Sequence, residues 1–316
     1  MAISAYIKEI GRGAQGARAL SREQAADLMG QLLDGHCSDL EIGAFCVAMR
    51  IKGETPVEMA GFLDAVQARM ALRPAADRAI VVLPSYNGAR KLPVLTPLLG
   101  WLLARQGLPV LMHGCATEAQ RVCASEVHAA LMDQGLDAMV SISTDAPQWV
   151  DTGALHPGLQ RLLDVRRAIG LRNSAHSLVK LMNPVAGPAL VVGSYTHPEY
   201  AQSMTATIGL MGGHAMLLRG TEGEPVADAR RAPRMDVFVN GQLQWTQSAQ
   251  EGPLAALPQL PARIDARSTA DYIRAVLCGD LPVPKPIALQ VAQIVRACDA
   301  VDGAAQDAPI AARQAA

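Results

Sequence analysis

Aromatic residues are scarce in this sequence, at 3% of 316 residues, although half of the residues are hydrophobic. A core large enough for one large domain or two unequal ones must therefore be built from aliphatic side chains. An excess of charge of either sign is also missing, because the formal net charge is -1. The field of the whole molecule is weak, so any anion-binding surface must come from local clusters of cations.

The six cysteines lack every spacing that is typical of a metal site or a redox motif. We expect them to be small, reduced core residues in a reducing compartment. The sequence also lacks a signal peptide and any apolar run of about 18–20 residues, the length of a membrane span. These absences predict a soluble, cytoplasmic protein with no membrane contact.

Residues 1–72 predict a small helical domain. A hydroxyl residue is followed three positions later by Gln or Glu at Ser21, Ser38 and Thr55, and an apolar stripe of helical period follows each time. The resulting helices carry apolar surface on more than one face. Such a module fits either an ordinary core within one chain or a dimer interface.

Residues 73–316 predict a larger α/β domain with a mainly parallel sheet, because short β-branched runs alternate with helical segments. Asn240-Gly241 indicates a type I′ hairpin within 235–245, and Ser268 is the expected cap of a helix that ends at Cys278. Strands are expected at 79–83, 108–112, 138–143, 189–195 and 215–218. Helices are expected at 97–106, 118–134, 157–181 and 286–301, and a further helix follows the strand at 189–195 and ends at 211.

Two long segments resemble anthranilate phosphoribosyltransferases. The first runs from Leu20 to Phe62 and the second, "HPGLQRLLDVRRAIGLRN", from His156 to Asn173, with "MNP" at 182–184. The resemblance implies a type III phosphoribosyltransferase fold, which is nucleoside phosphorylase-like, and a homodimer formed through the helical domain. It also places the helices near 160–185 with that domain.

The loop that holds the sugar pyrophosphate in this family is rewritten here. The family motif is GTGGDG followed by NIST, whereas this chain has Pro84, Ser85, Tyr86, Asn87 and Gly88 in the same place. Of these five residues only Gly88 is a glycine. Pro84 has no amide donor, and Tyr86 adds bulk where the backbone should approach the pyrophosphate closely. We therefore expect the amide cradle to be lost.

The second anion site of the family, KHGNRSVSSKSG, is also degenerate. His113 and Gly114 are kept, but the leading lysine is absent, and Glu118 brings a negative charge toward the site. Arg121 is a candidate replacement for the later lysine.

The magnesium-binding Asp-Glu pair of the family falls on Pro225 and Val226. The nearby Glu222 and Glu224 are either a remaining cation site or two solvated acids in a turn. We expect no cofactor, with magnesium retained only if transferase activity persists.

A residual site for the aromatic acceptor consists of His113, Gly114, His156 and Arg166. The latter two keep the ten-residue spacing of groups that lie near anthranilate in the family. Without a retained ligand, they are a helix start and a solvated arginine.

Cations gather around the old anion site, and they are either a solvated face or an anion-binding track that a dimer would double. The predicted set is Arg50, Lys52, Arg90, Lys91, Arg121, Arg166, Arg167, Arg172 and Lys180. "PSYNGARK", "TPLL" and "RGTEGEPVADARR" resemble the YbiB-type subgroup, which implies binding of nucleic acid without marked sequence preference, with Tyr86 as a stacking group. The alternatives are a phosphoribosyltransferase with an altered substrate and a pseudoenzyme with a small-molecule ligand in the cleft.

Overall fold

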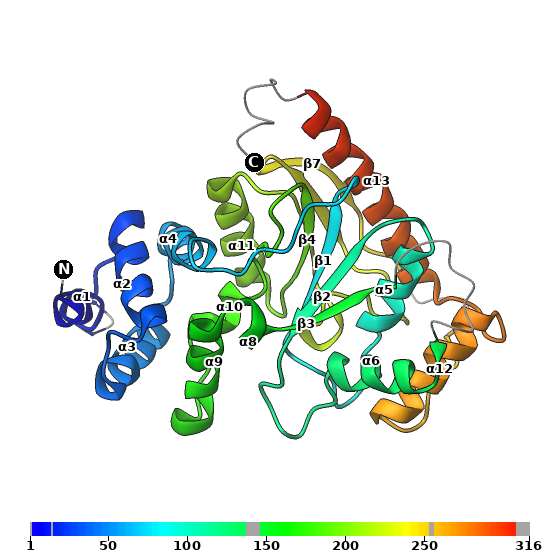
Figure 1. The fold of residues 1–316 in the computed structure, drawn as a ribbon, viewed down its shortest axis with the longest axis horizontal. Helices are drawn as coiled ribbons and strands as arrows, with labels where there is room; N and C mark the ends of the chain where they lie inside the picture. Colours follow the sequence, from blue (N-terminus) through cyan, green and yellow to red (C-terminus); the bar gives the residue numbers. More distant parts are fainter. Residues whose placement is uncertain (1, 14, 137–145, 253–255, 308–316) are drawn as a thin grey trace.

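The computed structural model describes residues 2–13, 15–136, 146–252 and 256–307. The chain begins with a helical domain and continues as an α/β domain, as the sequence predicts (Figure 1). Ser21, Ser38 and Thr55 each form the predicted capping box. The first helix was not predicted because its cap residue, Ala2, has no side chain that can accept a hydrogen bond. The helices are α1 (Ile3–Ile10), α2 (Arg22–Asp34), α3 (Asp39–Lys52) and α4 (Pro56–Gln67).

The described strands form one seven-stranded sheet in the order β3-β2-β1-β4-β5-β6-β7. The first five strands in chain order are parallel to one another, and β5 pairs with β6 and β6 with β7 in antiparallel fashion. The strands are β1 (Ile80–Ser85), β2 (Val110–Gly114), β3 (Gln148–Asp151), β4 (Ala189–Ser194), β5 (Ala215–Leu218), β6 (Met235–Val239) and β7 (Gln242–Gln247).

Four of the predicted strands and the hairpin are confirmed. Asn240 and Gly241 have φ values of 51° and 72°, the left-handed pair that a type I′ turn requires. The strand expected at 138–143 lies outside the described residues. The edge strand β3 was not predicted, since its partly exposed sequence lacks the apolar run of a buried strand.

The helices of the second part differ from the prediction at three places. The helix expected at 118–134 begins only at Ala124, and the one expected at 157–181 is interrupted at Gly170, where φ is 70°. Asp265, not Ser268, caps the penultimate helix: its Oδ1 accepts the Ser268 amide at 2.7 Å. The elements are α5 (Thr96–Ala104), α6 (Ala124–Asp133), α8 (Thr152–Leu155), α9 (Pro157–Ile169), α10 (Ala175–Leu178), α11 (Pro198–Met211), the 3-10 turn η1 (Thr221–Gly223), α12 (Ala266–Cys278) and α13 (Lys285–Asp307).

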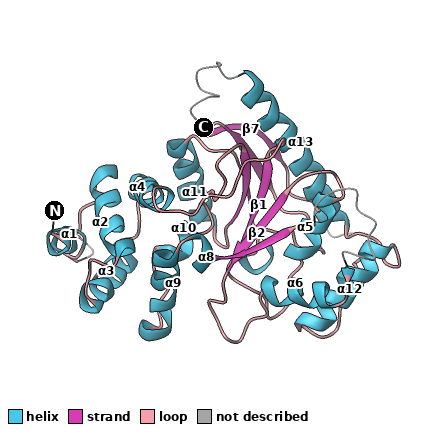
Figure 2. Ribbon diagram, viewed as in Figure 1, coloured by secondary structure: helices cyan, strands magenta, loops and turns pink. Residues whose placement is uncertain are grey.

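Helices cover both faces of the sheet (Figure 2). The alternation of β1 shows why: Val81 and Leu83 belong to the large core under α5, α6, α12 and α13, whereas Ile80 and Val82 belong to a core on the opposite face. A strand that is buried on both faces reads as a continuous apolar run, which is the signal the sequence carried.

A second large core unites the helical domain with α9 and α10. Leu28, Phe45 and Phe62 from the first part share it with Leu159 and Leu178 from the second. Among the six cysteines, Cys46, Cys123 and Cys298 are buried, and all six are free. No helix in the described part of the chain is long and apolar enough to cross a membrane.

Candidate functional site

The rewritten loop lies at the sheet edge where the parallel strands end. β1 and β2 end at Ser85 and Gly114, and β4 and β5 end at Ser194 and Leu218. In open α/β sheets this edge is the usual place for a ligand. The loops that follow β1 and β5 therefore meet there.

The Glu224 carboxylate fills the centre of the β1 loop. The backbone amides of Asn87 and Gly88 donate to Oε1 at 2.8 Å each, and the Thr96 hydroxyl donates to Oε2 at 3.0 Å. The Ser85 hydroxyl also donates to this carboxylate. With 1% of its surface exposed, Glu224 is a buried anion surrounded by hydrogen-bond donors.

The Glu222 carboxylate takes up the second half of the same loop. The amides of Lys91 and Leu92 donate to it at 2.9 and 3.0 Å, and the Arg90 amide donates at 3.3 Å. Arg121 Nη1 lies 3.4 Å from the other oxygen. The expectation that the amide cradle is lost is therefore wrong: amides still converge, but on carboxylates of the same chain.

Backbone geometry explains why Gly88 is the loop glycine that remains. Its φ is 61°, and a Cβ there would lie 2.7 Å from the Val122 carbonyl oxygen. The facing segment is shaped in the same way, because Gly223 has a φ of 89° and Asn87 donates to the Glu222 carbonyl at 2.9 Å. A left-handed conformation favours glycine at both positions.

The residues that match the family's magnesium site do not fit a metal. Pro225 and Val226 have no ligand atoms in their side chains, and both are buried. Glu222 and Glu224 are not two freely solvated acids in a turn, since their oxygens accept hydrogen bonds from the loop. Among the described residues, no group of three His, Cys, Asp or Glu side chains could hold a metal ion.

Tyr86 is a core residue, so the stacking role expected for it is wrong. Only 3% of its surface is exposed, and its hydroxyl lies 2.8 Å from both His113 Nδ1 and Thr152 Oγ1. Burial raises the pKa of Tyr86 well above its ordinary value and lowers the pKa of His113 to about 3. His113 is therefore neutral at physiological pH, and Gly114 beside it has no room for a Cβ against the Ser85 carbonyl.

The other two acceptor-site residues also have structural partners. His156 is the cap of α9, where its Nδ1 accepts the Leu159 amide at 3.2 Å. Burial lowers the pKa of His156. Arg166 Nη2 lies 2.6 Å from Glu118 Oε1. In the described part of the chain, His156 Nε2 and Arg166 Nη1 are buried without a hydrogen-bond partner, and the spacing of the pair is that of the family.

Glu118 gathers three of the predicted cations. Its carboxylate lies 3.0 Å from Arg121, 2.6 Å from Arg166 and 3.1 Å from Arg172. Burial alone would raise its pKa, but the hydrogen bonds and charges of Arg166 and Arg121 lower the pKa of Glu118 to about 2. The three guanidinium groups therefore share one internal counterion.

Lys180 is buried and Lys52 is partly buried, contrary to their expected place on an exposed track. Lys52 Nζ pairs with the buried Glu58 at 2.6 Å. Lys180 Nζ donates to the Gly223 carbonyl at 3.0 Å, and burial lowers its pKa to about 8.

The remaining cations of the predicted set are exposed. Arg167 lies 3.4 Å from Asp164. Arg50, Arg90 and Lys91 have no ion-pair partner in the part of the chain that the structure describes.

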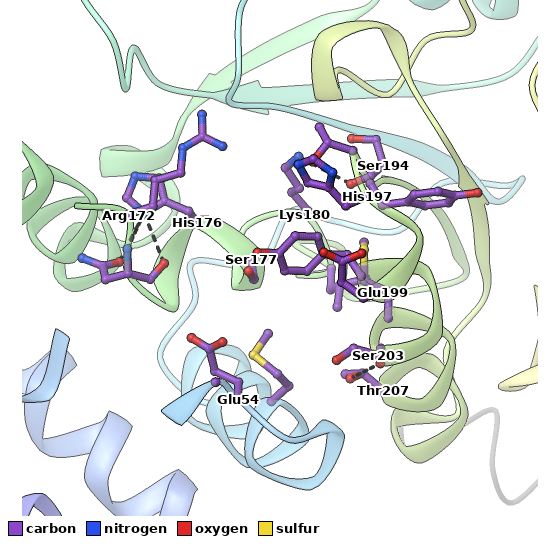
Figure 3. Close-up of a pocket in the computed structure, with 18 of the residues that line it drawn as sticks. Glu54, Arg172, His176, Ser177, Lys180, Ser194, His197, Glu199, Ser203 and Thr207 are labelled. Carbon is purple, nitrogen blue, oxygen red and sulfur yellow. Dashed lines mark hydrogen bonds between the residues drawn. The ribbon is translucent and has the colours of Figure 1, made fainter. Parts of the chain in front are cut away.

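A cavity of about 480 Å³ lies between the helical domain and the start of α11. Arg172 and His176 line one wall, and Lys180, Ser194 and His197 line the other (Figure 3). His176, His197 and Ser194 were not predicted from the sequence. Ser194 could have been found from its position at the end of a predicted parallel strand.

The comparisons with known proteins agree with this architecture. A model of the helical bundle domain of a glycosyl transferase family matches residues 4–70. The protein YbiB of Escherichia coli K12 is 38% identical over 294 residues, which are 90% of this chain and 91% of YbiB. Anthranilate phosphoribosyltransferase 2 of Ralstonia nicotianae is 27% identical over 288 residues, which are 89% of this chain and 83% of that enzyme.

A solved structure has the same fold as this chain. The crystal structure of anthranilate phosphoribosyltransferase from Thermus thermophilus superimposes with a TM-score of 0.69 at 19% identity. The match covers 95% of this chain and 89% of the enzyme. At this identity, the likeness concerns the fold.

Proposed function

Because this chain belongs to the anthranilate phosphoribosyltransferase-like family, we propose that it uses the transferase scaffold to bind the phosphate backbone of nucleic acid without marked sequence preference. One observation carries the proposal: Glu222 and Glu224 occupy the amides that a sugar pyrophosphate would need. A free pyrophosphate is thereby excluded from its old place, while cations remain on the outside of the same loop. The partner is single-stranded DNA or RNA.

The outward-facing cations supply the binding surface. Arg90 and Lys91 lie in the filled loop, and Arg50 lines the cavity beside it. Phosphates bound by such residues release counterions from the strand, so affinity falls steeply as salt rises. The near-zero net charge of the chain restricts this surface to the cleft.

A homodimer would double the surface, and α3 supports one. Leu40, Val47 and Ile51 lie on one face of that helix with 83, 42 and 63% of their surface exposed. An apolar stripe of this kind is expected to be covered by a partner. We propose that a second copy of this chain covers it.

Fluorescence anisotropy with a labelled single strand of about 20 nucleotides tests the nucleic-acid proposal. The variant Arg50→Ala/Arg90→Ala/Lys91→Ala is compared with wild type over a salt series. Each lost phosphate contact should lower the slope of log affinity against log salt by about 0.7, which gives about 2 for the triple variant.

A matched control removes three other exposed arginines, Arg263, Arg267 and Arg274, from the region of α12, on the far side of the α/β domain from α9 (Figure 1). This control should keep the wild-type slope. Affinity that hardly changes with salt, or that falls equally in both triple variants, would contradict the proposal.

A phosphoribosyltransferase with an altered substrate is the second candidate function. The cavity at the strand edge and the 27% identity to the Ralstonia nicotianae enzyme favour it. Calorimetric titration with phosphoribosyl pyrophosphate and magnesium gives binding heat if it is right, and no heat at millimolar ligand if it is wrong. A metabolite held in the same cavity without chemistry would instead co-purify with the protein and be found by mass spectrometry.

A further inference from the structure

The loop after β1 has the chemistry of a phosphate site. Five backbone N–H groups, those of residues 87, 88, 90, 91 and 92, donate to the carboxylates of Glu222 and Glu224. The hydroxyls of Ser85 and Thr96 add two more donors. Backbone N–H groups that converge in a loop form a concavity that binds phosphate and carboxylate groups alike. Its ligand here is the chain itself.

The segment that fills the loop is held in an unfavourable conformation. Glu222 has a φ of 50°, a left-handed value that residues other than glycine rarely adopt. A Cβ on the neighbouring Gly223 would clash with Asn87 Nδ2, so the two segments are in close contact. Such conformations persist where surrounding contacts hold them.

Contacts on the opposite side hold the same segment in place. The Ser194 hydroxyl and Lys180 Nζ both donate to the Gly223 carbonyl, at 2.6 and 3.0 Å. The turn that presents the carboxylates is thus fixed between the β1 loop and the end of β4. A turn fixed on both sides resembles a bound ligand more than a solvated surface loop.

We propose that Glu222 and Glu224 are a built-in substitute for a diphosphate, and that the loop binds inorganic pyrophosphate once both carboxylates are removed. Two carboxylates on adjacent stretches of one loop correspond to the two linked phosphates of pyrophosphate. The wild-type chain then has no affinity for pyrophosphate at this place. The proposal starts from the same filled loop as the proposed function, but its test measures pyrophosphate binding alone, so either proposal can fail without the other.

The double variant Glu222→Ala/Glu224→Ala of the full chain tests it. Thermal unfolding is followed with and without inorganic pyrophosphate, without magnesium and at matched ionic strength. The variant should unfold at a lower temperature than wild type, and saturating pyrophosphate should raise its midpoint by about 5 °C. Titration calorimetry should detect pyrophosphate binding to the variant and none to wild type.

Two controls distinguish the effect of the room that the alanine side chains leave from the effect of the lost negative charge. Glu222→Gln/Glu224→Gln removes the same charges but keeps the side-chain volume, and it should gain no response to pyrophosphate. Glu9→Ala/Glu23→Ala removes two charges from the helical domain and should also gain none. An equal response in either control would show that general electrostatics is the cause and would overturn the proposal.

A single variant keeps the test decisive if the double variant does not fold. Glu222→Ala leaves the buried Glu224 in place and frees the amides of Arg90, Lys91 and Leu92 beside Arg121. This variant should bind inorganic phosphate, which wild type should not. If neither alanine variant responds to phosphate or pyrophosphate, the proposal is wrong.

Discussion

Replacing Glu118 by Gln should change stability in a way that depends on pH. The carboxylate contacts three guanidinium groups, and its pKa falls from the ordinary 4.5 to about 2. A lowering of this size corresponds to at most about 3 kcal/mol near neutral pH. With 24% of the side chain exposed, solvent screening reduces the expected loss to about 1–2 kcal/mol.

The sign of the pH dependence follows from the direction of the pKa change. A carboxyl whose folded-state pKa is lowered stabilises the fold above its unfolded pKa, and this contribution is lost as pH falls to the folded pKa. The difference in the free energy of unfolding between wild type and Glu118→Gln should therefore be largest at pH 7 and should disappear between about pH 5 and pH 2. Urea unfolding at several pH values measures this difference. A difference that is absent at pH 7, or that stays constant down to pH 2, would refute the reasoning.

The same variant bears on nucleic-acid binding. Removing this carboxylate frees Arg166 and Arg172 for phosphates, whereas Arg121 still lies 3.4 Å from Glu222. Under the proposed function, affinity at low salt should rise, and the slope against salt should steepen by up to about 1.4. Unchanged or weaker binding would mean that Arg166 and Arg172 have a structural role only.

Three further changes have expected outcomes. Tyr86→Phe removes two buried hydrogen bonds and should lower the free energy of unfolding by roughly 1–3 kcal/mol in urea, and a loss near zero would show that water replaces them. Gly223→Ala should destabilise by more than about 1 kcal/mol, because its φ of 89° and its contact with Asn87 exclude a Cβ, whereas unchanged stability would show that the turn relaxes. Ile51→Asp places a charge on the exposed face of α3 and should turn a dimer into a monomer in light scattering, and a wild-type chain that is already monomeric would rule out the proposed interface.

Local signals in the sequence predicted much of the fold. The caps at Ser21, Ser38 and Thr55 fix their helices through contacts three residues away, and Asn240-Gly241 fixes its hairpin through two backbone angles. Such features depend on neighbours in the chain, so a sequence alone reveals them. Elements without a local signal, such as α1 and β3, were missed.

The candidate site depends on distant contacts, and there the sequence was a poorer guide. Glu224 meets Asn87 across 137 positions, so no local pattern could show that the acid fills the loop. The pairing of several predicted cations could not be foreseen for the same reason, since Glu118 lies 48 positions from Arg166. A count of charges along the chain identifies cations, but their counterions depend on the fold.

Pro84 has a consequence for the shape of the sheet. Ile80 donates its amide toward β4, to the Pro188 carbonyl, and Val81 donates toward β2, to the Pro109 carbonyl. Alternate residues of a strand face opposite neighbours, so position 84 faces β4, and a proline there has no N–H to give.

The ladder between β1 and β4 accordingly ends at Val82, although β4 continues to Ser194. Strands β1 and β4 are thus unpaired over their last residues, although they are neighbours in the middle of the sheet. The carbonyl of Gly223, Lys180 and the Ser194 hydroxyl meet at this opening. Beyond the last paired residues, the turn after β5 therefore contacts both strand ends, through Glu224 at Ser85 and through the Gly223 carbonyl at Ser194.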